Sequence, residues 1–270
     1  MTVIFECKTT DGHIIKILAE LLNSNIKTGC FIIDEKGIKL RMTDSNKRIL
    51  IDFYLKSENF YTYIYNSPNK FMNIGLNQTH FYKMLKSIKK KDSLVLFIDE
   101  QNSSELGIKI LPKENNRITT SYVKIQNIQY LEIDLPSGYA KPIIVPSNEF
   151  LKLMKDMNNI GSIIKITSSK HTVKFFCDAG SVYSREVVFG DDKNEKEDEI
   201  KKQYVQNEQD FDTEQLVRIA KISGLNSFLQ IYQNEELPIL FSASVGNIGN
   251  ISIFVKTKKQ LEEEQLKYTN

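Results

Sequence analysis

Four amphipathic helical segments recur along the chain at nearly constant spacing. In each, apolar residues stand close to positions i, i+3, i+4 and i+7, the pattern of a helix that buries one face. The segments begin near Gly12, Asn77, Ser147 and Asp212, so successive starts lie 65, 70 and 65 residues apart. Recurrence at this period predicts four equivalent structural units. The apolar stripes are Ile14, Ile17, Leu18 and Leu21; Phe81, Met84, Leu85 and Ile88; Phe150, Leu153, Met154 and Met157; and Leu216, Ile219, Ala220 and Ser223.

Short runs rich in β-branched and aromatic residues lie between the helices and are bounded by turn signals. One helix followed by several mostly antiparallel strands, repeated four times, predicts an α+β fold. We expect two similar domains, each with two helices packed on mostly antiparallel sheets. The predicted strands are residues 30–33, 38–42, 48–55, 60–65, 93–98 and 106–111, then 162–167, 172–177, 182–189, 228–232, 237–242 and 250–255.

A connector divides the chain near its middle. Residues 127–141 contain the sequence Leu135-Pro136-Ser137-Gly138 and lack the alternation of a strand. A length of 270 residues fits two domains of about 130 residues each. We expect an N-terminal domain at 1–126, an interdomain connector at 127–141, a C-terminal domain at 142–258 and a C-terminal tail at 259–270.

An acidic segment interrupts the second half. Residues 191–199 hold six acids and two lysines, which is too much charge to bury, so a solvated loop is expected. The pair Asp191-Asp192 is better explained as solvated charge than as a catalytic pair. Whether the segment regulates anything stays open.

The composition is that of an ordinary globular protein, with 41% hydrophobic and 26% charged residues. The longest apolar runs are far shorter than the roughly 20 residues that a membrane-spanning helix needs. Residues 1–7 resemble a strand rather than a signal peptide, so we expect an intracellular protein. Cys7, Cys30 and Cys177 are too scattered for a zinc site or a disulfide framework and are expected to be reduced core residues.

No catalytic motif is present in the sequence. His13, His80 and His171 are isolated, and the chain has no G-x-x-x-x-G-K-[ST], G-x-G-x-x-G or G-x-S-x-G motif. We therefore expect a non-enzymatic protein without a metal or cofactor. A hydrolase or nuclease stays open as an alternative, and an activity that depends on one carboxylate would distinguish it.

Cations lie on the polar faces of all four helical segments, although the net charge of the chain is only +2. The second segment is followed by Lys89, Lys90 and Lys91, and no acid occurs between residues 78 and 91. A single surface lysine is usually only solvated, but the recurrence favours a shared role. Helices lining one surface would contact phosphates without reading bases. The candidate DNA-binding residues are Lys16, Lys83, Lys86, Lys152, Lys155, Arg218 and Lys221.

Four motifs carry a resemblance to a known family. They are residues 37–46 with the Asp44-Ser45 pair, residues 77–86 with two lysines, residues 146–150 followed by Asp156 and Ile160-Gly161, and Leu237-Pro238-Ile239. In this order and spacing they resemble the sliding clamps of eukaryotes and archaea, the proliferating cell nuclear antigen family, over nearly the whole chain. The chain is identified as a divergent member of that family.

The resemblance implies a DNA polymerase processivity factor, a clamp that encircles double-stranded DNA of any sequence and tethers replication and repair enzymes. It implies the DNA clamp fold assembled into a ring, usually a homotrimer, with helices around the hole and sheets outside. Subunits would join through edge strands, residues 119–125 of one chain against 184–189 of the next. Every candidate DNA-binding residue except Arg218, which comes from the charge pattern alone, matches a basic position that faces DNA.

The resemblance also implies a groove beside the connector, where DNA polymerase and other clients dock short clamp-binding peptide motifs with aromatic anchors. Opening a closed ring implies an ATP-dependent clamp loader as a further partner. The family commonly has less charged residues at Thr43, Lys47 and Arg48, and residues 255–258 lack its usual Ala-Pro, so motif preference stays open. The candidate partner-peptide residues are Thr43, Lys47, Arg48, Leu50, Ile133, Leu135, Pro136, Pro238, Phe254, Lys256 and Thr257.

Two alternatives of the same class stay open: a subunit of a heterotrimeric checkpoint-type clamp, and a non-ring viral processivity factor. Subunit stoichiometry separates both from a homotrimer. Location in the nucleus or in a viral replication factory follows from the implied function and not from a sequence signal.

Overall fold

The computed structural model describes residues 3–114, 117–169, 171–190 and 207–269. The predicted acidic loop 191–199 lies outside these ranges. The chain forms two compact units: unit 1 is Met1–Ile133 with Ser244–Ser252, and unit 2 is Asp134–Ala243 with Ile253–Asn270. Among the described residues, no helix is long and apolar enough to cross a membrane.

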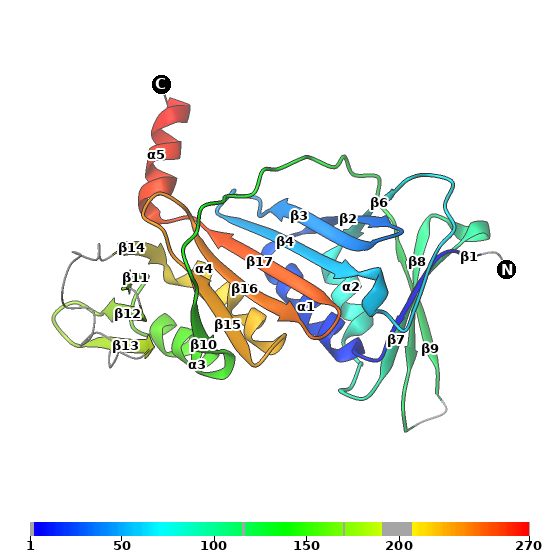
Figure 1. Ribbon diagram of the computed structural model, residues 1–270, viewed down its shortest axis with the longest axis horizontal. Helices are drawn as coiled ribbons and strands as arrows, with labels where there is room; N and C mark the ends of the chain where they lie inside the picture. The colour runs from blue at the N-terminus through cyan, green and yellow to red at the C-terminus, as the bar shows by residue number, and fades with distance from the viewer. Residues whose placement is uncertain (1–2, 115–116, 170, 191–206, 270) are drawn as a thin grey trace. The chain divides into compact units, whose positions relative to one another are not determined.

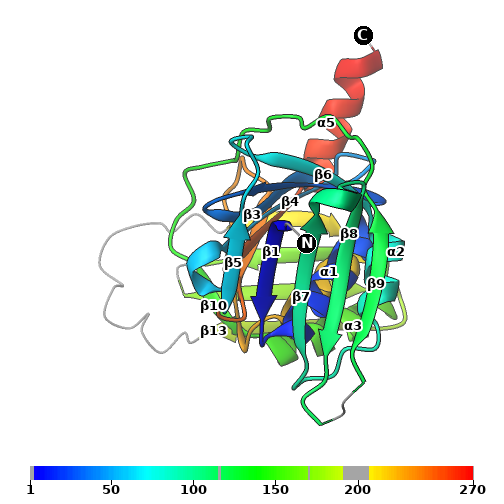
Figure 2. The same cartoon turned by 90° about the vertical axis from the view of Figure 1, so that its right-hand side faces the viewer.

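Unit 1 contains two helices that contact each other, α1 (Gly12–Asn25) and α2 (Gln78–Leu85). Its first sheet is antiparallel with the order β5-β1-β7-β8-β9, and Figure 2 looks onto it with the two helices on the far side. The strands of this sheet are β1 (Val3–Thr9), β5 (Thr62–Tyr65), β7 (Ser93–Asp99), β8 (Glu105–Leu111) and β9 (Thr119–Lys124).

The second set of strands in unit 1 has the antiparallel order β6-β2-β3-β4. Residues Ser244–Ser252 also belong to unit 1, where the Ile248 carbonyl accepts a hydrogen bond from the Lys56 N–H at 2.9 Å. The bounds are β2 (Thr28–Asp34), β3 (Gly37–Thr43), β4 (Ile49–Lys56) and β6 (Met72–Asn77), with short 3-10 turns at Ser57–Asn59 and Glu100–Asn102.

Unit 2 repeats the combination of helices and antiparallel strands. Its helices are α3 (Ser147–Asn158), α4 (Thr213–Ile219) with a 3-10 turn at Ala220–Gly224, and α5 (Lys258–Thr269), which projects beyond the end of β17 in Figure 1. One sheet has the order β13-β12-β11-β14, and a second set runs β10-β15-β16. The strands are β10 (Ile143–Pro146), β11 (Ile163–Ser168), β12 (Thr172–Asp178), β13 (Ser184–Gly190), β14 (Asn207–Asp212) and β15 (Phe228–Tyr232). Two further strands are divided between the units: β16 (Ile239–Val245) begins in unit 2 and ends in unit 1, and β17 (Gly249–Val255) begins in unit 1 and ends in unit 2.

Each unit has an aromatic cluster beneath one helix. Phe81 of α2 lies 6.1 Å from Phe31, ring centroid to ring centroid, and Phe150 of α3 lies 5.5 Å from Phe241 and 6.2 Å from Phe175. Phe81 and Phe150 are the first apolar residues of their predicted stripes. The two units therefore bury equivalent helix faces with the same kind of side chain.

The predicted apolar stripes are the buried faces of α3 and of the α4 region. For α1 the prediction was partly wrong, because Ile15 and Leu22 are fully buried whereas Ile14 and Ile17 are only half-buried. α1 contacts both α2 and β7, so its buried face is wider than one stripe and turned by one residue.

Three strands and one helix were not predicted: β6, β10, β14 and α5. In β14 only Gln209 and Phe211 are buried, and Phe211 is the one apolar residue of the strand. The sequence of β14 therefore shows no alternation of apolar and polar residues. Most of the segment expected as the C-terminal tail, residues 259–270, is helical and belongs to α5. α5 has no apolar stripe, and the contacts that order its start are polar.

Candidate functional site

The helices of unit 1 carry exposed cations. Lys83 and Lys86 are exposed and form no ion pair with any acid in the described ranges. Lys16 is half-buried, and its Nζ donates a hydrogen bond to the Ile88 carbonyl at 3.0 Å. An ammonium group has three donors, so Lys16 keeps two for other acceptors. Its charge stays close to the end of α2.

The pKa of the His13 imidazole is affected by the cations around α1. Its pKa is lowered, first by partial burial and then by the Lys16 and Lys90 cations. Lys90 therefore lies near enough to α1 to act on the imidazole, although it follows α2 in the chain. The sequence prediction omitted Lys90 from the candidate site, and the run of three lysines was the available signal.

The cations on the helices of unit 2 form more ion pairs with acidic side chains than those of unit 1 do. Lys155 is exposed and has no acidic partner among the described residues, whereas Lys152 pairs with Glu149 at 2.7 Å. Arg218 forms an ion pair with Glu214, one helical turn away. Lys221 is also exposed, on the 3-10 turn after α4.

The exposed cations suit sequence-independent contact with a polyanion. Lys83, Lys86 and Lys155 present charges on flexible side chains, without the fixed bidentate geometry by which arginine or amide groups read bases. Contacts of this kind attract phosphates in a salt-dependent way and exchange easily.

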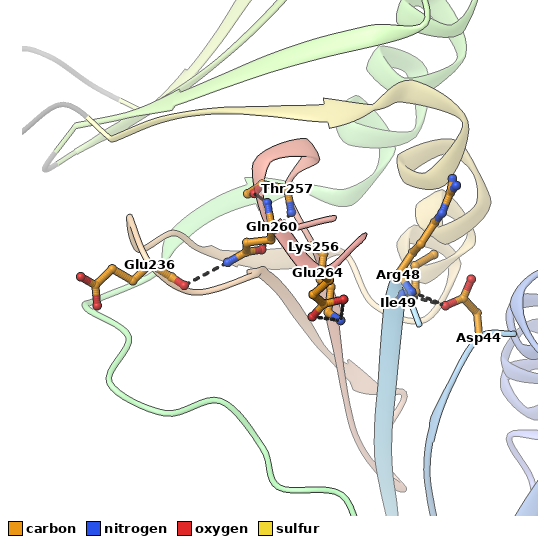
Figure 3. A network of polar contacts seen from close by, with 8 residues as sticks. All are labelled: Asp44, Arg48, Ile49, Glu236, Lys256, Thr257, Gln260 and Glu264. Atoms are coloured by element: carbon orange, nitrogen blue, oxygen red, sulfur yellow. Dashed lines mark hydrogen bonds and ion pairs between the residues drawn. The ribbon is translucent and has the colours of Figure 1, made fainter. Parts of the chain in front are cut away.

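The β3–β4 turn holds three of the predicted partner-peptide residues. Asp44 is 7% exposed, and its Oδ1 accepts hydrogen bonds from the Arg48 and Ile49 N–H groups at 2.7 and 2.9 Å (Figure 3). Lys47 has a φ of 54°, the left-handed region that non-glycine residues seldom adopt. Asp44 thus fixes the turn, and Thr43, Lys47 and Arg48 are displayed around it.

Leu50 lies on the outer face of β4. Buried and half-buried residues alternate along this strand, which places Ile49 and Ile51 in the core and Leu50 and Asp52 on the opposite face. Asp52 Oδ1 accepts from Arg41 Nε at 2.7 Å. Leu50 is therefore an apolar side chain on a face that is otherwise polar.

Residues 127–142 form neither helix nor strand, and each unit holds one part of them. In unit 1, Gly75 and Gln126 exchange backbone hydrogen bonds of 2.8 and 3.1 Å, and Arg41 Nη1 donates to the Ile133 carbonyl at 3.0 Å. The sequence prediction missed Arg41. Ile133 is half-buried at this attachment.

In unit 2 the attachment is Tyr139, which the sequence prediction also missed. Its hydroxyl donates to the Pro238 carbonyl at 2.6 Å, and its ring lies 6.2 Å from the rings of Tyr232 and Phe254. Partial burial raises the pKa of the Tyr139 phenol, so the hydroxyl stays protonated and donates. Phe254 is 4% exposed under this ring, whereas Leu135 and Pro136 are half-buried.

Lys256 and Thr257 are engaged at the start of α5 (Figure 3). Lys256 Nζ binds both carboxylate oxygens of Glu264, at 2.6 and 2.7 Å. Thr257 Oγ1 accepts from the Gln260 N–H at 3.1 Å, and Gln260 Oε1 accepts from the Thr257 N–H at 3.0 Å. This reciprocal pair is a capping box, and Gln260 Nε2 also donates to the Glu236 carbonyl at 2.9 Å.

Two outer strands offer unpaired edges. Within the described residues, β9 pairs only with β8, and β13 pairs only with β12. Large apolar side chains are exposed on or beside both strands: Tyr122 is 55% exposed, Ile118 60%, and Val188 48%. Apolar edges of this kind are prone to pair with another chain. β9 holds all but the last residue of the segment 119–125 predicted to join subunits, and β13 holds all of the segment 184–189.

The described residues hold no group of three His, Cys, Asp or Glu side chains that could bind a metal ion. Cys7, Cys30 and Cys177 are buried free thiols, and burial raises the pKa of each. Protonated, buried thiols are poor nucleophiles and poor metal ligands.

Comparison with known proteins identifies the architecture. The structure is similar to the crystal structure of proliferating cellular nuclear antigen from Entamoeba histolytica, with a TM-score of 0.80, 19% identity and coverage of 95% of this chain and 100% of the other. Two helix-and-sheet units of this kind define the α+β DNA clamp fold, which confirms the predicted fold class.

Family models match almost the whole chain: the N-terminal domain of proliferating cell nuclear antigen at residues 4–134 and its C-terminal domain at residues 135–259. The chain belongs to the proliferating cell nuclear antigen family, as the motifs predicted. It is 24% identical over 257 residues to "Probable DNA polymerase sliding clamp 1" of Paramecium bursaria Chlorella virus 1, covering 94% of this chain and 96% of that protein. It is 25% identical over 259 residues to the proliferating cell nuclear antigen of Chaetomium thermophilum, covering 94% and 97%.

Proposed function

We propose that this chain is a DNA polymerase processivity factor, a sliding clamp that encircles double-stranded DNA as a homotrimer and tethers replication and repair enzymes. The match to both domains of the family over residues 4–259 carries the proposal. The names of the viral and fungal relatives support it. The protein is proposed to act as a scaffold rather than an enzyme, where DNA is replicated, in the nucleus or a viral replication factory.

The proposed DNA-binding residues are those predicted from the helices, and they differ in how free their charges are. Lys83, Lys86 and Lys155 are the strongest candidates, because they are exposed and have no acidic partner among the described residues. Lys16, Lys152 and Arg218 would contribute less, because a carbonyl or an acid already holds the cation. Lys221 is exposed on the 3-10 turn after α4. Weak, exchangeable contacts suit a clamp, since tight contacts to bases would stop it from moving.

Closure of a ring would supply the retention that such contacts lack. Once closed, a ring leaves DNA only at an end or by opening, even if each phosphate contact lasts briefly. A tethered polymerase then rebinds at a high effective concentration. Opening the ring would require an ATP-dependent clamp loader.

The subunit contact is proposed at β9 of one copy and β13 of the next. Both strands are sheet edges with exposed apolar side chains, and pairing would satisfy their free backbone groups. Interfaces of this kind would carry the energy that holds the ring closed.

The residues proposed to bind client peptides are those predicted from the resemblance. In unit 1 these are Thr43, Lys47, Arg48, Leu50 and Ile133, of which Leu50 and Ile133 are half-buried apolar side chains. In unit 2 these are Leu135, Pro136, Pro238, Phe254, Lys256 and Thr257. Tyr139 covers Phe254, and α5 engages Lys256 and Thr257, so clients would meet Tyr139 and α5 in their place.

The first test is the mass in solution by light scattering across a range of concentrations. A homotrimer of 31.2-kDa chains weighs about 94 kDa, and that value is the expected result. The purified protein should then remain on circular DNA after loading and slide off linear DNA. A stable monomer at micromolar concentration would contradict the homotrimer and favour the mixed ring or the non-ring factor.

A further inference from the structure

Unit 1 has a basic groove that the candidate DNA-binding residues do not include. It lies between the turn after α2 and the connection from β8 to β9. The cations that line it are Lys89, Lys90, Lys91, Lys113 and Arg117, against two acids, Asp92 and Glu114. We call it the β9 groove, because Thr119, the first residue of β9, lines its edge.

The lysine-bearing side of the β9 groove is a fixed turn. Asp92 is 6% exposed, and its Oδ2 accepts a hydrogen bond from the Lys89 N–H at 2.9 Å. The Asp92 N–H in turn donates to the Lys89 carbonyl at 3.1 Å. The charge of Asp92 is therefore directed at the backbone, and the three lysine side chains extend from a closed turn.

The positive charge of the groove is largely uncompensated. Among the described residues, Lys91 alone of the groove cations has an acidic partner, Glu114 at 3.6 Å, and both side chains are at least 70% exposed, so the pair is weak. Lys89, Lys90, Lys113 and Arg117 have no ion pair within the parts of the chain that the structure describes. Four clustered cations of this kind create a local positive potential that attracts anionic groups.

The same sequence contains a matching acidic segment. β13 ends at Gly190, and residues 191–199, with six acids and two lysines, follow directly. The strands of both edge sheets pair in antiparallel fashion. If β9 and β13 of neighbouring copies continue that pattern, the first residue of β9 lies opposite the last residues of β13. The acidic segment of one copy then begins beside the β9 groove of the next.

We infer that the β9 groove receives the acidic segment 191–199 of a second copy, which adds an electrostatic contact at the end of the β9–β13 interface. This rests on the proposed homotrimer. The connection is long enough to reach beyond its own sheet. Residues 191–206 join Gly190, the last residue of β13, to Asn207, the first residue of β14, and these two strands are the opposite edges of a four-stranded sheet. That separation is about 14 Å for three strand spacings, and sixteen residues can span up to roughly 50 Å.

DNA phosphates are the other chemistry that these cations could bind. The position of the groove favours the acidic segment, since it adjoins the edge strand. Charge reversal distinguishes the acidic segment from DNA as the ligand. Reversing the charges of both the groove and the acidic segment should restore their contact, whereas the charge of the DNA phosphates cannot be reversed.

The experiment compares trimer assembly in four proteins by sedimentation at low and high salt. They are the wild type, Lys113→Glu with Arg117→Glu, Asp191→Lys with Asp192→Lys, and the combination of all four substitutions. All four positions lie outside the helix lining proposed to face DNA. The matched control is Lys36→Glu with Lys70→Glu, two exposed lysines of unit 1 away from the groove.

Each two-residue variant is expected to weaken assembly at least tenfold at low salt, and the four-residue variant to recover most of it. The losses should shrink at high salt, where screening shortens the range of charge interactions. Circular dichroism verifies that each variant is folded.

Three results would overturn the inference alone: assembly unchanged by both variants, no recovery in the combination, or DNA retention reduced in the groove variant with assembly intact. The last would assign the groove to DNA. A wild type that never assembles would instead overturn the homotrimer on which the inference rests.

Discussion

Lys256 binds both carboxylate oxygens of Glu264, at 2.6 and 2.7 Å. Lys256 directly follows β17, and Glu264 lies in the second turn of α5, so the pair holds the helix against the strand that leads into it. The family model ends at residue 259, before most of α5. Lys256 therefore lies within the part of the chain that the family model matches, whereas its partner Glu264 lies beyond it.

Reversing Glu264 should loosen the start of α5. The side chains of Lys256 and Glu264 are 25% and 43% exposed, so Glu264→Lys should cost about 0.5–1 kcal/mol of helix stability. Amide hydrogen exchange in α5 measures the loss. The double variant Lys256→Glu with Glu264→Lys should restore protection, and failure to do so would mean that the pair is incidental.

The capping box makes a separate contribution. Thr257→Ala removes the Oγ1 acceptor of the Gln260 N–H and should cost about 1 kcal/mol, seen as faster exchange in the first turn of α5. Thr257→Ser keeps the acceptor and is the matched control. Equal exchange in the Ala and Ser variants would contradict the capping role.

The helix cations should act on DNA and not on assembly. Replacing Lys83, Lys86 and Lys155 by Glu should reduce loading onto DNA and polymerase stimulation, while the mass in solution stays that of the wild type. The slope of log K against log salt should fall by about 0.9 for each phosphate that the variant no longer neutralises. Unchanged stimulation would show that the basic lining is incidental.

Tyr139 should stabilise the fold in two ways, through the hydrogen bond of its hydroxyl and through the packing of its ring. Tyr139→Phe removes the 2.6 Å bond to the Pro238 carbonyl and should lower the free energy of unfolding by about 1 kcal/mol. Tyr139→Ala also uncovers Phe254 and should cost about 2–4 kcal/mol. Denaturant unfolding measures both, and equal effects of Phe and Ala would contradict a packing role for the ring.

His13 should make stability depend on pH in one direction. Its pKa in the folded protein lies below the ordinary value of 6.5, so the unfolded chain binds the proton more readily. The contribution to stability is complete above about pH 6.5 and is lost as the pH falls toward the lowered pKa. His13→Gln should flatten this part of the stability profile.

Removing the positive charge of Lys90 provides a second test, which measures the pKa of His13. Lys90→Gln should raise the His13 pKa, because one of the two cations that lower it is removed, and NMR titration of the imidazole measures the change. An unchanged pKa would place Lys90 away from α1. Lys70→Gln is the control, since Lys70 is not among the cations that act on His13.

The features predicted from the sequence are those that show a periodic pattern of apolar residues. Buried stripes such as Phe150 to Met157 indicate a helix because the core requires apolar residues at helical spacing, and family motifs extended this to the clamp fold. α5 was missed because it has no apolar stripe, although the spacing of Thr257 and Gln260 is that of a capping box and was an available signal. Arg41 and Tyr139 were missed for a different reason, since their acceptors are carbonyls 92 and 99 residues away in the chain and are brought to them only by folding.

The hydrogen bonds of Arg41 and Tyr139 bear on the thermodynamics of partner capture. Folding already restricts the segment between them, through Ile133 in unit 1 and Pro238 in unit 2. A peptide that docks against a segment of this kind orders fewer backbone dihedrals on arrival than one that meets a free linker, so more of its interaction energy becomes affinity. Cutting either hydrogen bond should therefore appear in calorimetry as a larger unfavourable binding entropy, even where every residue that touches the peptide is unchanged.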